Sequence, residues 1–481
     1  MIANDYIMSH FLLFFVVNNN VVGYNKQIIC IFLIVLKSIP MIHLEGELMS
    51  ARILRQFHPV GQGAFYTEHI FCNHERFNVV YDCGSSTRKT IVEDQIQKSF
   101  KEGETIHALF ISHLHEDHIN GIPFLIKYCQ VKNIFFPLIS DVNKLILLHE
   151  LNEQKSSSDF TYQFISNPKN AINNLENNGN VKPKLIAVRE VSPNDSDSNN
   201  DIPFDLENDS PSQANSEGQL FDQSIPSGRI IKSSRFKGIW EYIPFNFDQN
   251  NRKQELETVL RKSDIIVCNG EFTQYGKTLT PTEAIQVTKG AYDKITGKRN
   301  SNSMTLFSGT SNNISLMYRP IYFRRYDIDS FNFFLDSYFN EHYNIDFYDF
   351  IYDNFIDDYS IYELNRYSIN HILFGNMNPG CLYTGDYDAA TDIYFSALKD
   401  HYEEYWSTIG CFQVPHHGSN NNFNSGLIEK NNVYIISAGN HNKYRHPSAT
   451  VLKKIHLNGG YPFVITEDFS SYLAQTFCFD F

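Results

Sequence analysis

A dense cluster of metal-binding residue types, His113-Leu114-His115-Glu116-Asp117-His118, directly follows the apolar run 108–111. The three imidazoles and the Asp117 carboxylate, held this close, require partners when buried, and the imidazoles repel one another when charged. A divalent cation satisfies all of them at once, whereas a solvated histidine-rich turn is the alternative that involves no metal. The sequence therefore predicts a metal site at the end of a buried strand.

The spacing within the cluster predicts two neighbouring metal positions. A strand over 108–112 would send His113 and His115 out of its end on the same side, while Asp117 and His118 open the following apolar segment. One ion would then lie on His113 and His115, and the other on Asp117 and His118. Nitrogen and oxygen donors favour zinc, with manganese or iron as alternatives. Two such ions lower the pKa of a shared water and hold the oxygens of the group that is cleaved.

The cluster matches in full the HxHxDH signature of the metallo-beta-lactamase superfamily, and other segments resemble pieces of that family in the family's own order. These segments are the opening hairpin 57–63, the early strand 79–84 ending in Asp-x-Gly, the strand 302–307, the strand and carboxylate 381–386, the strand end 414–419, and the run 435–448. Together they resemble one branch most. This branch is the hydrolase domain attached to bacterial competence DNA-uptake channels, with its stand-alone relatives, including phosphorylcholine esterases.

The resemblance implies an α/β fold of four layers, an αββα sandwich with two sheets face to face and helices outside both. Periodicity alone supports only a mixed α/β class. The domain would occupy residues 49–481 with two insertions. The first, 192–228, is rich in Ser, Asn and Asp and predicted to be disordered. The second, 318–371, is rich in Tyr and Phe at helical spacing and predicted to form one or two packed helices, with a lid over the metal cleft as the alternative.

The resemblance also implies the metal ligands, which are His113, His115, Asp117, His118, Asp386 and His417. Asp386 would bridge the two ions, and an ordinary Gly-Asp turn residue is the alternative. Many family members supply a third histidine to the first ion from the interval before Asp386. That interval contains only His149, His342 and His371, none of them in a convincing setting at a strand end. Whether the site holds one ion or two therefore stays open at this point.

The candidate catalytic residues are Asp117, His416 and His446. His416 would donate a hydrogen bond to the substrate beside His417, although these two could exchange roles. His446 either orients the substrate or caps the turn before the next residue, a proline. Asp82 is interpreted as a residue that orients a ligand rather than as a ligand itself.

Composition narrows the class of substrate and the compartment. The 481 residues carry a net charge of -14 and a pI near 5.7, which disfavours strong nonspecific binding to duplex DNA, because phosphate tracks are met by Lys and Arg. The eight cysteines contain no CxxC pair and no disulfide framework. We interpret them as thiols of a reduced compartment, and the sequence therefore predicts a cytoplasmic protein.

The first 48 residues contain two apolar runs, 11–17 and 28–36, both shorter than the ~20 residues that a spanning helix needs. No secretory leader pattern is present. Glu45-Gly46-Glu47 can be encoded by a purine-rich tract of the ribosome-binding type, and Met49 follows at a suitable distance. We therefore expect residues 1–48 to be an upstream extension from a misplaced start codon. Membrane association is the alternative if they are translated.

These observations predict a metal-dependent hydrolase whose activated hydroxide attacks a phosphodiester, in a nucleotide or a single-stranded nucleic acid. Asp117 and the metals would stabilise the attacking oxygen, and His416 or His446 would polarise the phosphoryl oxygen or assist the leaving group. A small-molecule esterase or lactonase is the first alternative, since the same kind of site opens carbonyl centres. A binding module with a depleted metal site is the second, because fold alone does not decide the substrate.

Overall fold

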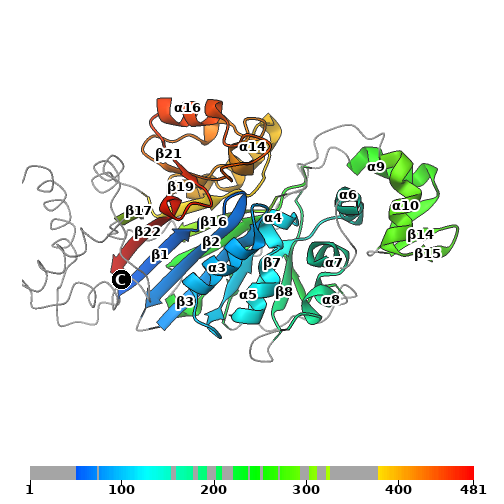
Figure 1. The fold of residues 1–481 in the computed structure, drawn as a ribbon, viewed down its shortest axis with the longest axis horizontal. Coiled ribbons are helices and arrows are strands. Elements are labelled where there is room, and N and C mark those ends of the chain that lie inside the picture. Colours follow the sequence, from blue (N-terminus) through cyan, green and yellow to red (C-terminus); the bar gives the residue numbers. More distant parts are fainter. Residues whose placement is uncertain are drawn as a thin grey trace, which may run out of the picture. The chain divides into compact units, whose positions relative to one another are not determined.

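A computed structural model gives the fold of residues 50–480 (Figure 1). The described residues exclude the internal segments 73–74, 153–158, 177–181, 192–201, 208–219, 237–238, 250–252, 269–270, 293–302, 311–320 and 325–377. The predictions for residues 1–48, and for helices in the aromatic-rich insertion beyond residue 324, therefore lie outside the described residues.

A nine-stranded sheet forms the first β layer. Its order is β10 (Gln223–Ile225), β8 (Lys184–Val188), β7 (Asn133–Pro137), β5 (Ala108–Phe110), β3 (Glu75–Ser85), β2 (Gly63–Cys72), β1 (Ser50–Phe57), β22 (Leu473–Asp480) and β17 (Ile321–Arg324). The strands from β3 through β10 run parallel, whereas β2, β1, β22 and β17 pair antiparallel. The carboxyl end of β5, where the histidine cluster begins, is thus at the centre of the sheet.

An eight-stranded sheet forms the second β layer. Its order is β21 (Tyr461–Ile465), β20 (Val433–Ser437), β19 (Ile409–Gln413), β18 (Gly380–Tyr383), β16 (Thr305–Thr310), β12 (Trp240–Phe245), β11 (Ile231–Lys232) and β9 (Phe204–Asp205). Strands β18, β19, β20 and β21 pair parallel with one another, whereas β18 pairs antiparallel with β16. Since the carboxyl ends of parallel strands meet at one edge, the segments that follow β18, β19 and β20 are brought together there.

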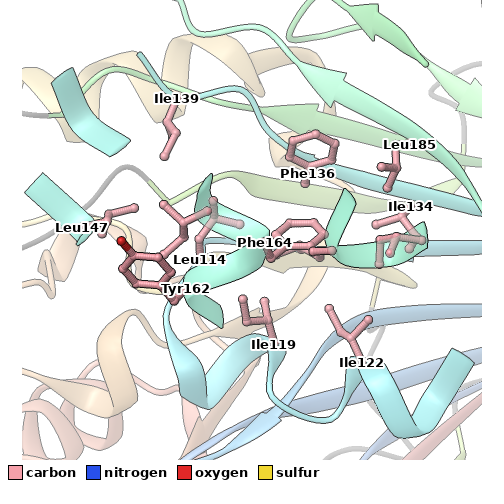
Figure 2. Close-up of a cluster of buried hydrophobic side chains, with 14 of the residues drawn as sticks. Leu114, Ile119, Ile122, Ile134, Phe136, Ile139, Leu147, Tyr162, Phe164 and Leu185 are labelled. Atoms are coloured by element: carbon pink, nitrogen blue, oxygen red, sulfur yellow. The ribbon is translucent and has the colours of Figure 1, made fainter. Parts of the chain in front are cut away.

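Helices cover the outer face of each sheet. The first sheet is covered by α3 (Lys89–Ser99), α4 (Glu116–Ile119), α5 (Ile122–Tyr128), α6 (Asp141–Asn152), α7 (Phe160–Ser166) and α8 (Pro168–Asn173). The second is covered by α14 (Asp392–His401), α15 (Glu403–Trp406) and α16 (Ala449–Leu457). Figure 2 shows Leu114 of the histidine cluster and Ile119, which directly follows it, among Tyr162, Phe164 and other buried apolar side chains. This packing anchors the cluster in the core.

Smaller elements complete the described part of the chain. Strands β4 (Thr105–Ile106) and β6 (Gln130–Val131) form a two-stranded parallel pair. A separate three-stranded antiparallel sheet is made of β13 (Ile265–Cys268), β14 (Glu271–Gln274) and β15 (Lys277–Leu279), and it is flanked by α9 (Lys253–Lys262) and α10 (Pro281–Tyr292). Helix α10 contacts α6. This module is therefore attached to the first helical layer.

The central core lies between the two sheets and confirms the predicted four-layer αββα sandwich. Strand β3 packs on both of its faces. Val79 and Tyr81 lie in the core between the two sheets, and Val80, between them in sequence, lies in the core under the helices. A strand buried on both faces requires a continuous apolar run, which residues 79–81 provide. In the second sheet, Tyr383 faces the central core and Leu382 faces α14 and α16.

A buried ion pair joins the two sheets inside this core. Arg55 on β1 and Glu68 on β2 are cross-strand partners, and Arg55 Nε donates to Glu68 Oε1 at 2.7 Å. The carboxylate also accepts hydrogen bonds from the second sheet, from Ser308 Oγ at 2.7 Å and Tyr383 OH at 2.9 Å. Burial alone would raise the pKa of Glu68, but Arg55 and these donors lower it below its ordinary value. Glu68 therefore stays ionised in the core.

The structure corrects three expectations at the level of single elements. Within 192–228, predicted to be disordered, Phe204 of β9 and Ile225 of β10 are 1% and 0% exposed, so the prediction is wrong for these two short strands. Within 318–371, predicted to be helical, residues 321–324 form β17 instead. The apolar run 463–466 predicts the last strand of the chain, and β21 does form there, but β22 follows it and pairs with β1. Short strands, and strands that pair across the two ends of the chain, form because of partner strands that are distant in sequence.

Among the described residues, no helix combines the length and the apolar character that crossing a membrane would require.

Candidate metal centre

Four strand ends from the two sheets supply the predicted site residues. The histidine cluster follows β5 of the first sheet, and Asp386 follows β18 of the second. His416 and His417 follow β19, and His446 lies in the loop that follows β20. The two sheets are linked directly at this place, since the backbone N–H of Met304, just before β16, donates to the carbonyl of Ser112 at 2.7 Å.

Asp386 is the central carboxylate of the site. Its Oδ2 lies 3.5 Å from His113 Nε2 and 3.2 Å from His416 Nδ1. Its Oδ1 lies 3.8 Å from His118 Nε2 and 3.9 Å from His417 Nε2. One imidazole from each sheet therefore faces each oxygen of the same carboxylate.

Asp117 and His115 complete the cluster. Asp117 Oδ2 lies 3.3 Å from His417 Nε2, and the His115 ring is edge-on to His113 with 4.7 Å between centroids. Three sets of side chains have donor atoms that lie within 4.8 Å of one another and could hold a metal ion: His113, Asp117 and His118; His113, His115 and Asp386; His118, Asp386 and His417. The second and third sets share only Asp386.

Buried polar atoms without a hydrogen-bond partner converge at this point. They are His113 Nε2, His118 Nε2, Asp386 Oδ1 and His416 Nδ1. A buried polar atom left unsatisfied costs about 1–3 kcal/mol, so four in one place require an explanation. The atoms are nitrogen and oxygen donors of the types that bind divalent cations. The residues present therefore fit a metal centre.

The hydrogen bonds around the site leave the Nε2 atoms of three histidines directed at its centre. His417 Nδ1 lies 2.8 Å from the carbonyl oxygen of Ser437, which can only accept, so Nδ1 carries the proton. His118 Nδ1 lies 2.7 Å from Asp82 Oδ2, and His113 Nδ1 lies 2.9 Å from Ser112 Oγ. When Nδ1 donates outward, the lone pair of a neutral imidazole is on Nε2 and is available to a metal.

Asp82 holds this outer layer together without facing the centre. Its Oδ1 accepts from the backbone N–H of Ser112 at 2.7 Å, and its Oδ2 accepts from Ser112 Oγ and His118 Nδ1, both at 2.7 Å. Asp82 is fully buried, and none of the three potential ligand sets includes it. This geometry agrees with the interpretation of Asp82 as a residue that orients a ligand.

Replacing Asp82 with asparagine is expected to weaken metal binding about 10- to 100-fold, which is the usual effect of losing a partner that orients a metal-binding histidine. The amide keeps the size of the side chain but provides one acceptor oxygen instead of two, so either Ser112 or His118 loses its partner. Asparagine also tolerates the φ of 54° found at this position. Competition with a chromophoric chelator would measure the affinity. An affinity equal to that of the wild-type protein would contradict this role.

The backbone at the site is held in conformations that are unfavourable for most residues. His416 and His417 have φ values of 50° and 55°. Such left-handed residues cost of order 1–3 kcal/mol each and persist where the surroundings enforce them. Gly385 has a φ of 52°, and a Cβ there would overlap the Ser303 and Ser112 side chains. Glycine therefore lets the chain pass close enough for Asp386 to enter the centre.

Three polar side chains position the segment that carries Asp386. Ser303 Oγ accepts from the Asp386 backbone N–H at 3.0 Å, and Gln413 Oε1 accepts from the backbone N–H of Gly385 at 3.0 Å. Asn422 Nδ2 donates to the Asp386 carbonyl at 3.3 Å. Sequence reasoning missed these residues and Ser112. Among them, only Ser112 is marked by a local sequence feature, which is its position directly before the cluster.

The pKa values describe a site with excess negative charge. Burial alone would lower the pKa of His118, but Asp82 and Asp117 outweigh it and raise this pKa to about 9. Burial would raise the pKa of Asp386, but His416 and His113 hold it well below its ordinary value. By contrast, burial and His113 lower the pKa of His115 to about 3. Ionised carboxylates inside the protein are the charge that a divalent cation would neutralise.

The structure brings together every site residue named from the sequence. The His446 ring lies 5.8 Å from that of His416, so His446 lines the rim rather than the centre. His416 and Asp117 have 28% and 21% of their side chains exposed and form the open side of the site. His149, considered as a third histidine, lies elsewhere and contacts Thr288 of α10. His342 and His371 lie outside the described residues.

Comparison with known proteins agrees with this geometry over part of the chain. Residues 70–141, which contain Asp82 and the histidine cluster, match the family model of the metallo-beta-lactamase superfamily. The match supports a domain of this superfamily. The sandwich fold described above is consistent with it.

Curated relatives match over short segments. Ribonuclease J of Mycoplasma pneumoniae is 35% identical over 85 residues, which is 16% of this chain and 14% of that protein. Ribonuclease Z of Sulfolobus acidocaldarius is 33% identical over 96 residues, 19% of this chain and 29% of that protein. The chain thus spans less than a third of either relative. Among solved structures, unliganded yeast PDE1 aligns over 88% of this chain and 99% of its own, at 8% identity and a TM-score of 0.33.

Proposed function

We propose that the protein is a metal-dependent phosphodiesterase with two divalent cations, zinc by preference. His113, His115 and Asp386 would hold one ion, and His118, Asp386 and His417 the other, with Asp117 beside the second. The observation that carries the proposal is the convergence of unpartnered buried atoms on Asp386, with the outward nitrogens of the histidines already occupied. Nitrogen and oxygen donors in small sets are typical of catalytic zinc.

The residues of the chain have distinct roles in this proposal. When bound, the cations lower the pKa of a water and neutralise charge on the phosphoryl group. Asp117, partly exposed and 3.3 Å from His417, orients the attacking water and accepts its proton. His416, at the open side, donates to a phosphoryl oxygen or to the leaving oxygen. Burial lowers the pKa of His446 to about 4, so its ring is neutral at pH 7 and orients the substrate by hydrogen bonding.

The proposed substrate is a phosphodiester of a nucleotide or a single-stranded nucleic acid. Two relatives are ribonucleases by name, which supports a nucleic-acid substrate. The net charge of -14 argues against long duplex substrates. The narrower resemblance to competence-channel hydrolase domains and phosphorylcholine esterases rests on the sequence segments alone. A cytoplasmic location belongs to the same proposal, and it is supported by Cys83, Cys129, Cys381 and Cys411, which are buried free thiols.

A substrate panel tests the proposal. Zinc-loaded protein is assayed with bis-p-nitrophenyl phosphate, dinucleotides, p-nitrophenyl acetate and a homoserine lactone, before and after treatment with a chelator. We expect turnover of the phosphodiesters that chelation removes and zinc restores. Turnover of the carboxylic ester or lactone alone would replace the phosphodiesterase with the esterase alternative. Bound zinc with no turnover of any compound would favour the binding module.

A further inference from the structure

The loop after β20 presents exposed charged and aromatic side chains beside the metal centre. Lys443, Tyr444 and Arg445 are exposed, and Tyr444 keeps 62% of its surface accessible. Two cationic residues flank this exposed aromatic residue in the sequence, in a chain whose net charge is -14. The cleavage mechanism proposed above does not use any of the three.

The loop is rigidly held, so the three side chains project from a fixed base. Asn442 closes it with three hydrogen bonds. Its Nδ2 donates to the carbonyls of Gly439 at 2.7 Å and His446 at 2.6 Å, and its Oδ1 accepts from the His446 N–H at 2.7 Å. Asn440 Nδ2 donates to Asp468 Oδ2 at 2.8 Å. Preorganisation of this kind reduces the entropy that binding must overcome.

A line of aromatic rings connects Tyr444 to the metal centre. The Tyr444 and His446 rings are stacked, with centroids 5.8 Å apart and planes 25° from parallel. The His446 ring meets that of His416 edge-on at 5.8 Å, and His416 Nδ1 is 3.2 Å from Asp386 Oδ2. A ligand stacked on Tyr444 would therefore lie next to any phosphoryl group held at the centre.

We propose that Lys443, Tyr444 and Arg445 form a nucleotide platform that binds the nucleotide flanking the scissile phosphodiester; this inference rests on the proposed function. Tyr444 stacks on the base, while Lys443 and Arg445 bind the adjacent phosphates. Lys443 Nζ now lies over the Tyr444 ring, 4.7 Å from its centroid. The flexible lysine stem lets the ammonium leave the ring for a phosphate, and a base takes the face it uncovers.

Charge and geometry select the occupant of the nucleotide platform. An aromatic ring alone could also take a quaternary ammonium group such as choline. Two cations directly beside Tyr444 repel such a group and attract phosphate instead. A base must be unstacked from its neighbours to reach a protein ring, so the ligand is single-stranded rather than duplex.

Fluorescence anisotropy with a labelled, phosphorothioate-linked octadeoxyadenylate tests the nucleotide platform, because this linkage keeps its charge and resists hydrolysis. We expect Tyr444→Ala to weaken binding roughly tenfold or more, the size of one base stacked on an aromatic ring, and Tyr444→Phe to retain the affinity within about twofold. Lys443→Gln and Arg445→Gln should each reduce the slope of log affinity against log salt by about 0.7, the value for one phosphate contact on a single strand. Tyr275→Ala is the matched control, since Tyr275 is 81% exposed and belongs to the three-stranded module.

The outcomes separate this inference from the proposed function. Equal affinities of Tyr444→Ala and wild-type protein would overturn the nucleotide platform, even if small phosphodiesters are hydrolysed. Unchanged salt slopes in both glutamine variants would overturn the phosphate contacts. If Tyr444→Ala loses affinity while the wild-type protein hydrolyses no phosphodiester, the nucleotide platform stands and the proposed catalytic function fails.

Discussion

Asp386→Ala is expected to reduce phosphodiester turnover by roughly a thousandfold or more, equivalent to about 4 kcal/mol of lost transition-state stabilisation, and to leave less than one metal ion per chain. Asp386 belongs to two of the three potential ligand sets, and its two oxygens each face two imidazoles. Without it, His113 and His118 keep unpartnered nitrogens in a buried centre and no carboxylate links them. Steady-state kinetics together with metal analysis by mass spectrometry would measure both effects.

Two variants control for folding and for position. Asp386→Asn preserves the shape of the side chain but leaves only one acceptor oxygen. Turnover should fall at least a hundredfold, equivalent to about 2.7 kcal/mol of transition-state stabilisation, while the circular dichroism spectrum stays unchanged. Asp388→Asn changes a nearby carboxylate that accepts from the Ala390 N–H at 3.1 Å and from Thr391. It should keep turnover and metal content near wild-type values. Full activity in Asp386→Ala would contradict the central role of this carboxylate.

Glu68→Ala is expected to lower the free energy of unfolding by about 3–5 kcal/mol, the usual cost of removing one partner of a buried ion pair. The substitution leaves Arg55, 0% exposed, without its carboxylate in the core between the sheets. It also leaves hydrogen-bond donors of the second sheet without their acceptor, among them Ser308 and Tyr383. Urea unfolding followed by fluorescence would report this change, because Trp240, one of two tryptophans, lies beside Glu68.

A surface ion pair provides the matched comparison. Glu75 lies 2.9 Å from Arg235, and their side chains are 62% and 39% exposed. Removing Glu75 should cost less than about 1 kcal/mol, because solvent screens the pair. Since the folded-state pKa of Glu68 is lowered, its contribution is fully present above its ordinary pKa and is lost as pH falls through the folded value. Equal losses in Glu68→Ala and Glu75→Ala would contradict the account of the core.

The sequence predicts those parts of the site that are dense along the chain. The cluster 113–118 concentrates its ligands in one turn, so residue types and spacing alone identify it. Asp386 and His417 lie far from it in sequence and were predicted through the family resemblance. Ser303 and Gln413, which position Asp386, are common polar residues whose role depends on contacts 83 and 28 residues away. No local pattern distinguishes them from surface residues.

Parts of the fold escaped prediction for the same physical reason. Strands β9 and β10 lie in polar sequence, and each relies on few apolar residues, such as Phe204 and Ile225, that dock on distant strands. The average composition of the segment does not reveal these few buried residues. Charged residues in a strand usually indicate a solvated face, yet Arg55 and Glu68 are buried because both sheet faces are covered. Their pairing becomes apparent only from the strand register.

The most direct test of the central claim is anomalous X-ray diffraction at the zinc absorption edge, from crystals of protein loaded with zinc. Two anomalous peaks are expected, one among His113, His115 and Asp386 and one among His118, Asp386 and His417. No peak within this cluster, in protein that has been given excess zinc, would contradict the assignment of a metal centre. A single peak would contradict the two-ion arrangement on which the proposed mechanism depends.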